Sequence, residues 1–242
     1  MLRVDCIKKS FGGVEAIKGS SFEIATGKVT ALVGPNGAGK TTLFDIIGGY
    51  IRADSGQVFL CDEDISKKDS HVIANKGVSR TFQQVRLFQY LTILDHLIMT
   101  EGNDDMRMMY SAFRRPQTDQ KKYELLLRDF GIDRTLDTVV SDLSYGQRKL
   151  LDLAMAIHRP HTLLMLDEPV AGVNTIIQER IESLLLNIRT KGDTIVLIDH
   201  DMGFVKKLAD HVIVLDAGHV IVEEKPDDVL RDERVLSAYL GI

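Results

Sequence analysis

Residues 34–41 combine glycines, a lysine and a threonine at the spacing G-x-x-x-x-G-K-T, which is the pattern of a phosphate-binding loop. The glycines let the backbone curl so that several N–H groups point at one anion. An apolar strand over residues 29–33 should lead into the loop, and a helix over residues 41–47 should add the positive end of its dipole. Lys40 is expected to reach the β- and γ-phosphates of a nucleotide, and Thr41 to offer a hydroxyl to Mg²⁺. A glycine-rich turn with an accidental lysine is the alternative. The predicted phosphate-binding positions are Gly34, Pro35, Asn36, Gly37, Ala38, Gly39, Lys40, Thr41 and Thr42.

A second segment ends an apolar run with two adjacent acids. Residues 163–166 read Leu-Leu-Met-Leu and are followed by Asp167 and Glu168. A buried strand seldom ends this way for packing reasons, because an unpaired buried charge is costly. Beside a phosphate loop, Asp167 is expected to hold the Mg²⁺ shell and Glu168 to polarise the attacking water as a catalytic residue. A strand-end turn with two solvated acids is the alternative.

His200 follows a predicted strand over residues 194–198. A lone histidine usually has a structural role, but ligands of open α/β sheets collect at the carboxyl ends of the strands. This strand is expected to neighbour the one that ends at Asp167 and Glu168. The histidine is therefore expected to hydrogen-bond the γ-phosphate and the attacking water.

The segment Leu-Ser-Tyr-Gly-Gln, residues 143–147, precedes a predicted helix. Ser144 is a good N-cap residue, and the start of a helix attracts anions. Plain helix capping is a serious alternative to a binding role. However, the segment lies far along the chain from Gly34, so a second anion site here is best used across an interface with another subunit.

Short runs rich in Val, Ile and Leu alternate with helical stretches, which favours an α/β fold with a mostly parallel central sheet. The clearest predicted strands cover residues 29–33, 163–166, 194–198 and 211–215. None alternates polar with apolar residues, as expected when both faces of the sheet are covered. An N-terminal antiparallel β layer is predicted from residues 2–7, 14–17, 21–24 and 57–60.

Between residues 88 and 159 the residue pattern becomes typical of helices. Apolar residues recur on one helical face at positions 123, 126, 127 and 130. A second helix is expected from Tyr145 toward Arg159, where Pro160 stops it. The sequence thus predicts a single domain over residues 1–242, in which residues 1–87 and 160–242 form the α/β core and residues 88–159 a helical subdomain.

The composition is that of an ordinary globular protein. The chain has 242 residues, 44% hydrophobic and 27% charged, with a net charge of −5, so sequence-wide nucleic-acid binding is not expected. Cys6 and Cys61 are too few for a disulfide framework and are expected to be small core residues in a reducing compartment. The N-terminus lacks the apolar run of a signal peptide, and no apolar stretch approaches the ~18 residues of a membrane span.

Taken together, the four segments resemble, in their order and rough spacing, the ATP-binding subunit of an ABC transporter, and the likeness runs from end to end. The resemblance implies an ATPase with Mg²⁺ as cofactor, in a head-to-tail dimer that sandwiches two ATP molecules. Each ATP would lie between one subunit's phosphate loop and Ser144, Gly146 and Gln147 of the other. It also implies transmembrane permease subunits docked near residues 84–99, a solute-binding protein in the full complex, and a peripheral position on the cytoplasmic face of the membrane.

Further positions follow from the resemblance alone. Phe11 matches the aromatic residue that stacks on adenine, with a core aromatic as the alternative. Gln83 matches a catalytic glutamine that contacts Mg²⁺ and water, with Gln84 as its rival. Residues 171–174 match the loop that crosses the dimer interface. Asn174 stands there where aspartate is usual, and Tyr145 stands where glycine is usual in residues 143–147, which match the signature segment of the family.

Within the family, the chain is most similar to the larger ATPase subunit of branched-chain amino-acid importers, a group that includes importers of urea and short amides. The similarity rests on the segment 143–147, on residues 11–13, 80–83 and 86–88, on the tail 238–241, and on the long insertion over residues 102–117. Lipid or lipopolysaccharide export and a non-transport ABC ATPase are the alternatives. A P-loop kinase or GTPase would not explain the segment 143–147, and a module that has lost catalysis would not need the intact lysine and acids.

Overall fold

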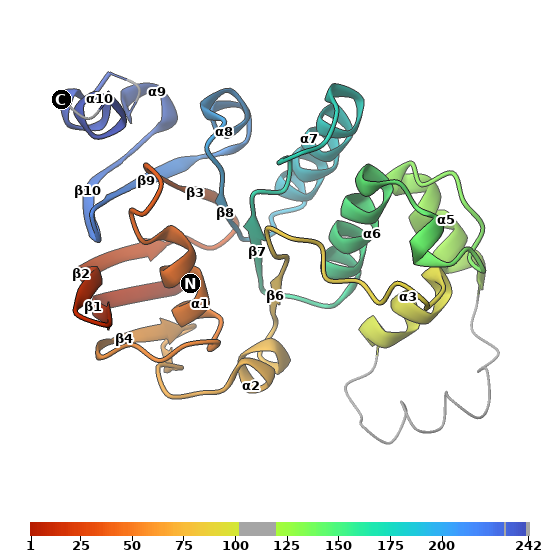
Figure 1. Cartoon of the computed structure of the whole chain (residues 1–242), viewed down its shortest axis with the longest axis horizontal. Coiled ribbons are helices and arrows are strands. Elements are labelled where there is room, and N and C mark those ends of the chain that lie inside the picture. Colours follow the sequence, from red (N-terminus) through yellow and green to blue (C-terminus); the bar gives the residue numbers. More distant parts are fainter. Residues whose placement is uncertain (102–119, 230, 241–242) are drawn as a thin grey trace.

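The computed structural model describes residues 1–101, 120–229 and 231–240, which form two β-sheets and a set of helices (Figure 1). One sheet has four antiparallel strands in the order β2-β1-β4-β5. Its strands are β1 (Leu2–Phe11), β2 (Val14–Ile24), β4 (Ser55–Leu60) and β5 (Glu63–Asp64). The predicted antiparallel layer is confirmed, although residues 14–17 and 21–24 belong to one continuous strand.

The second sheet has six strands in the order β10-β9-β3-β8-β7-β6. These are β3 (Val29–Val33), β6 (Val78–Arg80), β7 (Leu163–Asp167), β8 (Ile195–Ile198), β9 (His211–Asp216) and β10 (His219–Glu224). Every neighbouring pair is parallel except β9 and β10. The predicted α/β class with a mostly parallel central sheet is therefore confirmed.

Both faces of this sheet are covered, which explains the unbroken apolar runs in β7, β8 and β9. On β3, Val29, Ala31 and Val33 belong to one buried cluster, and Leu32 belongs to the other. The first cluster includes residues of the helices on one side of the sheet. The second includes apolar residues of the antiparallel layer and of the helix after β3. The central sheet is thus a rigid platform held from two sides.

The helices are α1 (Lys40–Ile47), α2 (Ser70–Asn75), α3 (Ile93–Glu101), α5 (Gln120–Phe130), α6 (Tyr145–His158), α7 (Thr175–Thr190), α8 (Met202–Leu208), α9 (Pro226–Val229) and α10 (Glu233–Leu240), with a short 3₁₀ turn at Val140–Asp142. In Figure 1, α3, α5 and α6 gather at the end of the molecule opposite the antiparallel sheet. Tyr123, Leu127 and Phe130 of α5 are buried, as the periodicity predicted. α6 ends at His158 because Arg159 precedes proline and turns to extended backbone.

The prediction that both cysteines are core residues was wrong, because Cys6 and Cys61 are exposed. Cys6 has a φ of 48°, and the pairing register of β1 shifts between Val4 and Ile7. An irregularity of this kind changes which residues face inward, so Val4 and Ile7 are buried and Cys6 is not. Cys61, with a φ of 49°, lies in the turn after β4.

The long insertion predicted over residues 102–117 lies outside the described residues. Within the described ranges, no helix is long and apolar enough to span a membrane.

Candidate functional site

Parallel pairing of β6, β7, β8 and β3 brings four chain segments to one edge of the sheet. The phosphate loop follows β3, Asp167 ends β7, Asp199 follows β8, and Thr81 follows β6. Since the strands run in one direction, their carboxyl ends meet at the same edge. The predicted residues that lie far apart in the sequence are therefore neighbours at this edge.

The phosphate loop needs glycine at its two ends for steric reasons. A Cβ on Gly34, whose φ is +147°, would lie 2.0 Å from the carbonyl oxygen of Leu215. A Cβ on Gly39 would lie 2.5 Å from Ile17 Cδ1 and 2.7 Å from the carbonyl oxygen of Ala16. Gly39 also precedes α1 without any side-chain cap. The first N–H groups of α1 therefore have no side-chain acceptor of their own and can serve an anion.

We expect Gly34→Ala to destabilise the fold by about 2–5 kcal/mol, because a positive φ at a residue other than glycine costs about 1–2 kcal/mol and an overpacked contact costs about 1–3 kcal/mol. Gly192→Ala is the matched control, since Gly192 has a φ of +87° but nothing within 4 Å of its would-be Cβ. Its expected loss is only about 1–2 kcal/mol. Urea unfolding followed by circular dichroism measures both losses. Equal losses in the two variants would contradict the role of the Leu215 contact.

Lys40 is folded over its own loop. Its ammonium donates hydrogen bonds to the carbonyl oxygens of Gly34, at 2.8 Å, and of Pro35, at 3.0 Å. Burial lowers the pKa of Lys40, while the charges of Glu168 and Asp167 act in the opposite direction. The lysine thus holds a charge that has few solvent contacts, beside the loop where a phosphate would enter.

Asp167 is buried at the end of β7. Burial raises the pKa of its carboxyl group, and the nearby charge of Arg80 partly offsets the effect. Arg80 Nη2 lies 3.7 Å from Asp167 Oδ2 and 2.8 Å from Asp45 Oδ1. The backbone N–H of Asp167 donates to Thr81 Oγ1 at 3.3 Å. The carboxylate therefore lies beside the Arg80 guanidinium, and the Thr81 hydroxyl fixes the backbone of Asp167.

Arg80 was not predicted as a site residue, although it stands in the segment 80–83. Its guanidinium carbon lies 4.8 Å from the ring centroid of Phe82, 5.1 Å from that of Tyr50 and 5.6 Å from that of Phe44. These aromatic faces and the carboxylate of Asp45 compensate a cation whose side chain is only 5% exposed. A basic residue at the end of a buried strand is the sequence signal that could have identified it.

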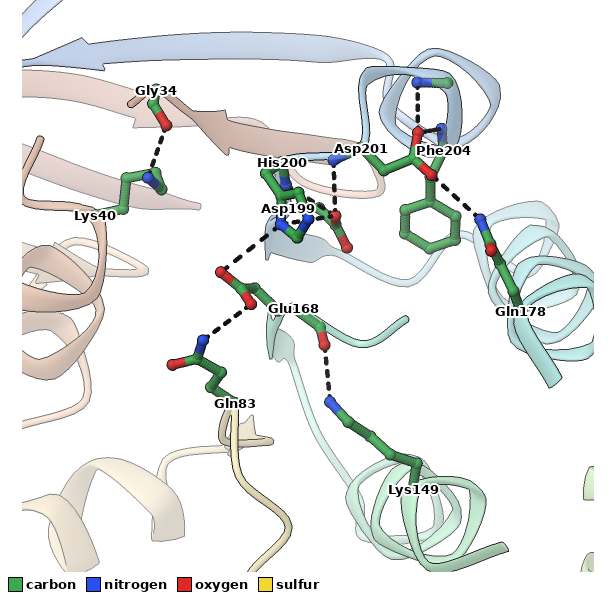
Figure 2. A network of polar contacts seen from close by, with 11 residues as sticks. Gly34, Lys40, Gln83, Lys149, Glu168, Gln178, Asp199, His200, Asp201 and Phe204 are labelled. Atoms are coloured by element: carbon green, nitrogen blue, oxygen red, sulfur yellow. Dashed lines mark hydrogen bonds and ion pairs between the residues drawn. The ribbon is translucent and has the colours of Figure 1, made fainter. Parts of the chain in front are cut away.

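The carboxylate of Glu168 lies close to two other candidate site residues, Gln83 and His200 (Figure 2). Its Oε2 accepts a hydrogen bond from Gln83 Nε2 at 3.0 Å, and its Oε1 lies 3.9 Å from His200 Nδ1. The φ of Glu168 is +47°, which is unusual for a residue other than glycine. Of the two glutamines that the sequence left open, Gln83 makes this contact, although both side chains are exposed.

Asp199 organises the turn that carries His200. Its Oδ1 accepts from the N–H of His200 at 2.8 Å and from that of Asp201 at 3.0 Å. Burial raises the pKa of Asp199, and these backbone hydrogen bonds act against the shift. The His200 side chain is 67% exposed and therefore open to a ligand. Asp199 was missed as a site residue because its role depends on the turn.

The oxygen atoms offered by the predicted ligand residues suit a magnesium ion. Hard oxygen ligands are what Mg²⁺ prefers, and the predicted ligands offer them as the carboxylate of Asp167, the hydroxyl of Thr41 and the amide oxygen of Gln83. Thr41 is exposed on the first turn of α1, followed by the half-buried Thr42. The Gln83 amide directs its nitrogen to Glu168, which leaves its oxygen for another partner.

Phe11 is not a core residue, because 48% of it is exposed. It ends β1 and pairs with Val14 at the tip of the hairpin. The ammonium of Lys9 lies 5.3 Å from its ring centroid. Strand β2 of the same hairpin contacts the phosphate loop, since Ala16 and Ile17 are the neighbours of Gly39. An exposed ring on this hairpin is compatible with the predicted stacking on a base.

The structure gives Ser144 a local role at the start of α6. Ser144 Oγ accepts from Gln147 N–H at 3.2 Å, and Gln147 Oε1 accepts from Ser144 N–H at 3.1 Å, which together form a capping box. These described contacts of Ser144 and Gln147 stay within the first turn and do not reach residues 34–42. The structure therefore does not bring the segment 143–147 to the phosphate loop of its own chain.

Two neighbouring positions connect this helix start to the loop 171–174 and to the first turn of α7. A Cβ on Gly146 would lie 3.0 Å from Ile177 Cγ1, and one on Gly172 would lie 3.3 Å from Tyr145 Cε1. Asn174 caps α7 by accepting from Ile177 N–H at 3.0 Å. Asparagine thus performs the capping that an aspartate would also perform.

Comparison with known proteins gives consistent matches. Residues 17–171 match the family model described as ABC transporter. Over its whole length the chain is 32% identical to the probable branched-chain amino acid transport ATP-binding protein LivG of Archaeoglobus fulgidus, of which it covers 95%. It is also 32% identical over its whole length to the high-affinity branched-chain amino acid transport ATP-binding protein BraF of Pseudomonas aeruginosa, of which it covers 98%.

Solved structures show the same likeness. A nucleotide-free ATP-binding cassette from an ABC transporter has a TM-score of 0.86 at 30% identity, covering 100% of this chain and 99% of that chain. The ADP conformation of an ATP-binding cassette of an ABC transporter has a TM-score of 0.85 at 30% identity, with the same coverage.

Proposed function

Because the chain belongs to the ABC transporter family, we propose that it is the ATP-binding and ATP-hydrolysing subunit of an importer of branched-chain amino acids or related small solutes. The observation that supports hydrolysis is the carboxylate of Glu168, which lies between the Gln83 amide and the His200 ring at the edge that carries the phosphate loop. The solute class rests on the full-length likeness to LivG and BraF.

The chemistry follows from the positions of these groups. Backbone N–H groups of the loop and the Lys40 ammonium bind the phosphates of ATP. The carboxylate of Glu168 accepts a proton from the attacking water, and Gln83 orients that carboxylate. His200 donates a hydrogen bond to the γ-phosphate, where negative charge develops. Mg²⁺ held by Thr41, Asp167 and Gln83 would neutralise phosphate charge when bound.

The start of α6 is proposed to serve a second ATPase subunit, identical or paralogous, in a head-to-tail dimer. Ser144 is exposed, and the described contacts of its side chain use the N–H of Gln147 only. The N-terminus of a helix favours negative charge, so Ser144, Gly146 and Gln147 can meet the ATP of the partner. Asn174, in the adjoining loop, would lie at the same interface.

Transmembrane permease subunits are proposed to dock on residues 84–99. Phe88 is 64% exposed and Tyr90 is 88% exposed, and exposed aromatic residues are favoured at interfaces. The chain would then lie peripherally on the cytoplasmic face of the membrane, with a solute-binding protein completing the importer. Movement of the proposed helical subdomain, residues 88–159, would transmit dimer closure to the permeases.

The test is transport-coupled ATPase activity. We expect the chain to co-purify with permeases encoded beside its gene and, in liposomes, to hydrolyse ATP faster when the solute-binding protein is loaded with a branched-chain amino acid. Stimulation by a lipid and not by amino acids would support export. Complete absence of ATP hydrolysis would contradict the proposal.

A further inference from the structure

Lys149 is a buried lysine that the mechanism above does not use. It lies on α6, four residues after the first residue of that helix, and is 4% exposed. Its ammonium donates a hydrogen bond to the backbone carbonyl oxygen of Glu168 at 2.8 Å (Figure 2). The helix that begins at the signature is thereby joined directly to the residue proposed as the catalytic base.

A buried lysine is unfavourable unless its contacts compensate it. Burial lowers the pKa of Lys149, and the carboxylates of Asp152, Glu168, Asp167 and Asp199 act in the opposite direction. Its described hydrogen bond goes to a neutral carbonyl group and not to any of these carboxylates. The contact with the Glu168 backbone is therefore its specific interaction.

That backbone needs support. Glu168 has a φ of +47° and precedes Pro169, which disfavours compact backbone at the residue before it. A non-glycine residue in this region costs about 1–3 kcal/mol and persists when its surroundings fix it. Three hydrogen bonds fix the backbone of Glu168. The Glu168 N–H donates to Ile198 at 2.9 Å, and the Glu168 carbonyl accepts from Ala171 N–H at 3.2 Å and from Lys149.

We propose that Lys149 is a positioning residue, which holds the left-handed backbone of Glu168 so that its carboxylate faces Gln83 and His200. Two of the three supports come from the segments beside Glu168 in the sheet and its turn, and Lys149 is the one that comes from α6. A displacement of the signature helix would therefore act on the carboxylate through this contact. The inference rests on the proposed ATPase function.

The test compares Lys149→Met, which keeps an unbranched side chain without the ammonium, with Lys149→Arg, which keeps a donor. We expect the kcat for ATP to fall about 10–100-fold in Lys149→Met, because misplacing a catalytic group by about 1 Å costs on the order of 10²-fold. The Kd for ATP should stay within about twofold, since Lys149 does not contact the phosphate loop, and Lys149→Arg should recover most of the kcat. Lys121→Met, at an exposed position on α5, should match the wild type.

A double-mutant comparison separates positioning from a general packing effect. In a Glu168→Gln background, adding Lys149→Met should change single-turnover hydrolysis by less than about twofold, because the carboxylate through which Lys149 acts is already gone. A further tenfold loss there, or a kcat of Lys149→Met within twofold of the wild type, would overturn the inference. If Lys149→Met does not fold, Lys149→Gln replaces it under the same criteria. Failure of the proposed function looks different, because the wild type would then lack ATPase activity or Glu168→Gln would retain it.

Discussion

Glu168→Gln is expected to bind ATP within about twofold of the wild type while its steady-state turnover falls about 10²–10⁴-fold, the usual contribution of a general base. Glutamine has nearly the same shape, and its amide oxygen can still accept the hydrogen bond that Gln83 donates to Glu168 Oε2. The amide of glutamine is neutral, however, and cannot accept a proton from water as the carboxylate does. Binding and chemistry should therefore separate in this variant.

Phosphate release measures the turnover, and titration with a fluorescent ATP analogue measures the binding. A variant that does not hydrolyse ATP should keep it bound between the two subunits of the dimer. We therefore also expect ATP and Mg²⁺ to shift Glu168→Gln toward a dimer in size-exclusion chromatography. Glu124→Gln, at an exposed position on α5, is the matched control and should behave as the wild type. Brisk hydrolysis by Glu168→Gln would remove Glu168 from its role.

Lys40→Ala is expected to weaken ATP binding by about 10–150-fold, since a hydrogen bond to a charged group is worth about 1.5–3 kcal/mol. Turnover should fall further, by at least about 10²-fold, because the ammonium also stabilises charge that develops on the phosphate. The fold should tolerate the change. The lost contacts are two carbonyls of the loop itself, Gly34 and Pro35, and a partly desolvated ammonium is removed with them.

Isothermal titration with ATP and Mg²⁺ gives the affinity, and circular dichroism confirms that the variant is folded. Lys121→Ala is the control for loss of one positive charge at an exposed position. Unchanged steady-state ATPase activity in Lys40→Ala would contradict the interpretation of residues 34–42 as a phosphate loop.

The central strands could be predicted because their signals are local. β3 has four apolar residues and one buried threonine and is followed by the glycine-rich loop, and a run of this kind is typical of a strand covered on both faces. β7 was recognised in the same way. β6 was missed because it has only three residues, Val78–Arg80, and owes its existence to pairing with β7.

The contacts that complete the site could not be predicted, because they join segments that the sequence keeps apart. Position 149 could be placed on a helix, but its contact with Glu168 depends on how α6 packs beside β7. The ion pairs of Arg80 with Asp45 and Asp167 depend likewise on the order of strands and helices. The exposure of Cys6 depends on a shift in the pairing register of β1 with β2, which no pattern of residues in the sequence predicts.

The sequence could identify Ser144 as a helix cap but not decide what else it does. The capping box with Gln147 is present, so the modest interpretation of the segment is correct as far as one chain goes. Capping and phosphate binding are compatible, since a cap satisfies one N–H group and leaves others at the helix start. A nucleotide-bound dimer is the setting in which the second role can be seen.

The tyrosine in the signature has a steric consequence for the neighbouring loop. The Tyr145 ring lies where a side chain at position 172 would begin, with Cε1 3.3 Å from the would-be Cβ of Gly172, whose φ of +73° also favours glycine. The tyrosine at position 145 thus adds a steric reason for glycine at position 172 beside the positive φ. With glycine at position 145 the steric contact would be absent and only the positive φ would still favour glycine at 172, so a side chain at 172 should be tolerated better beside glycine than beside tyrosine.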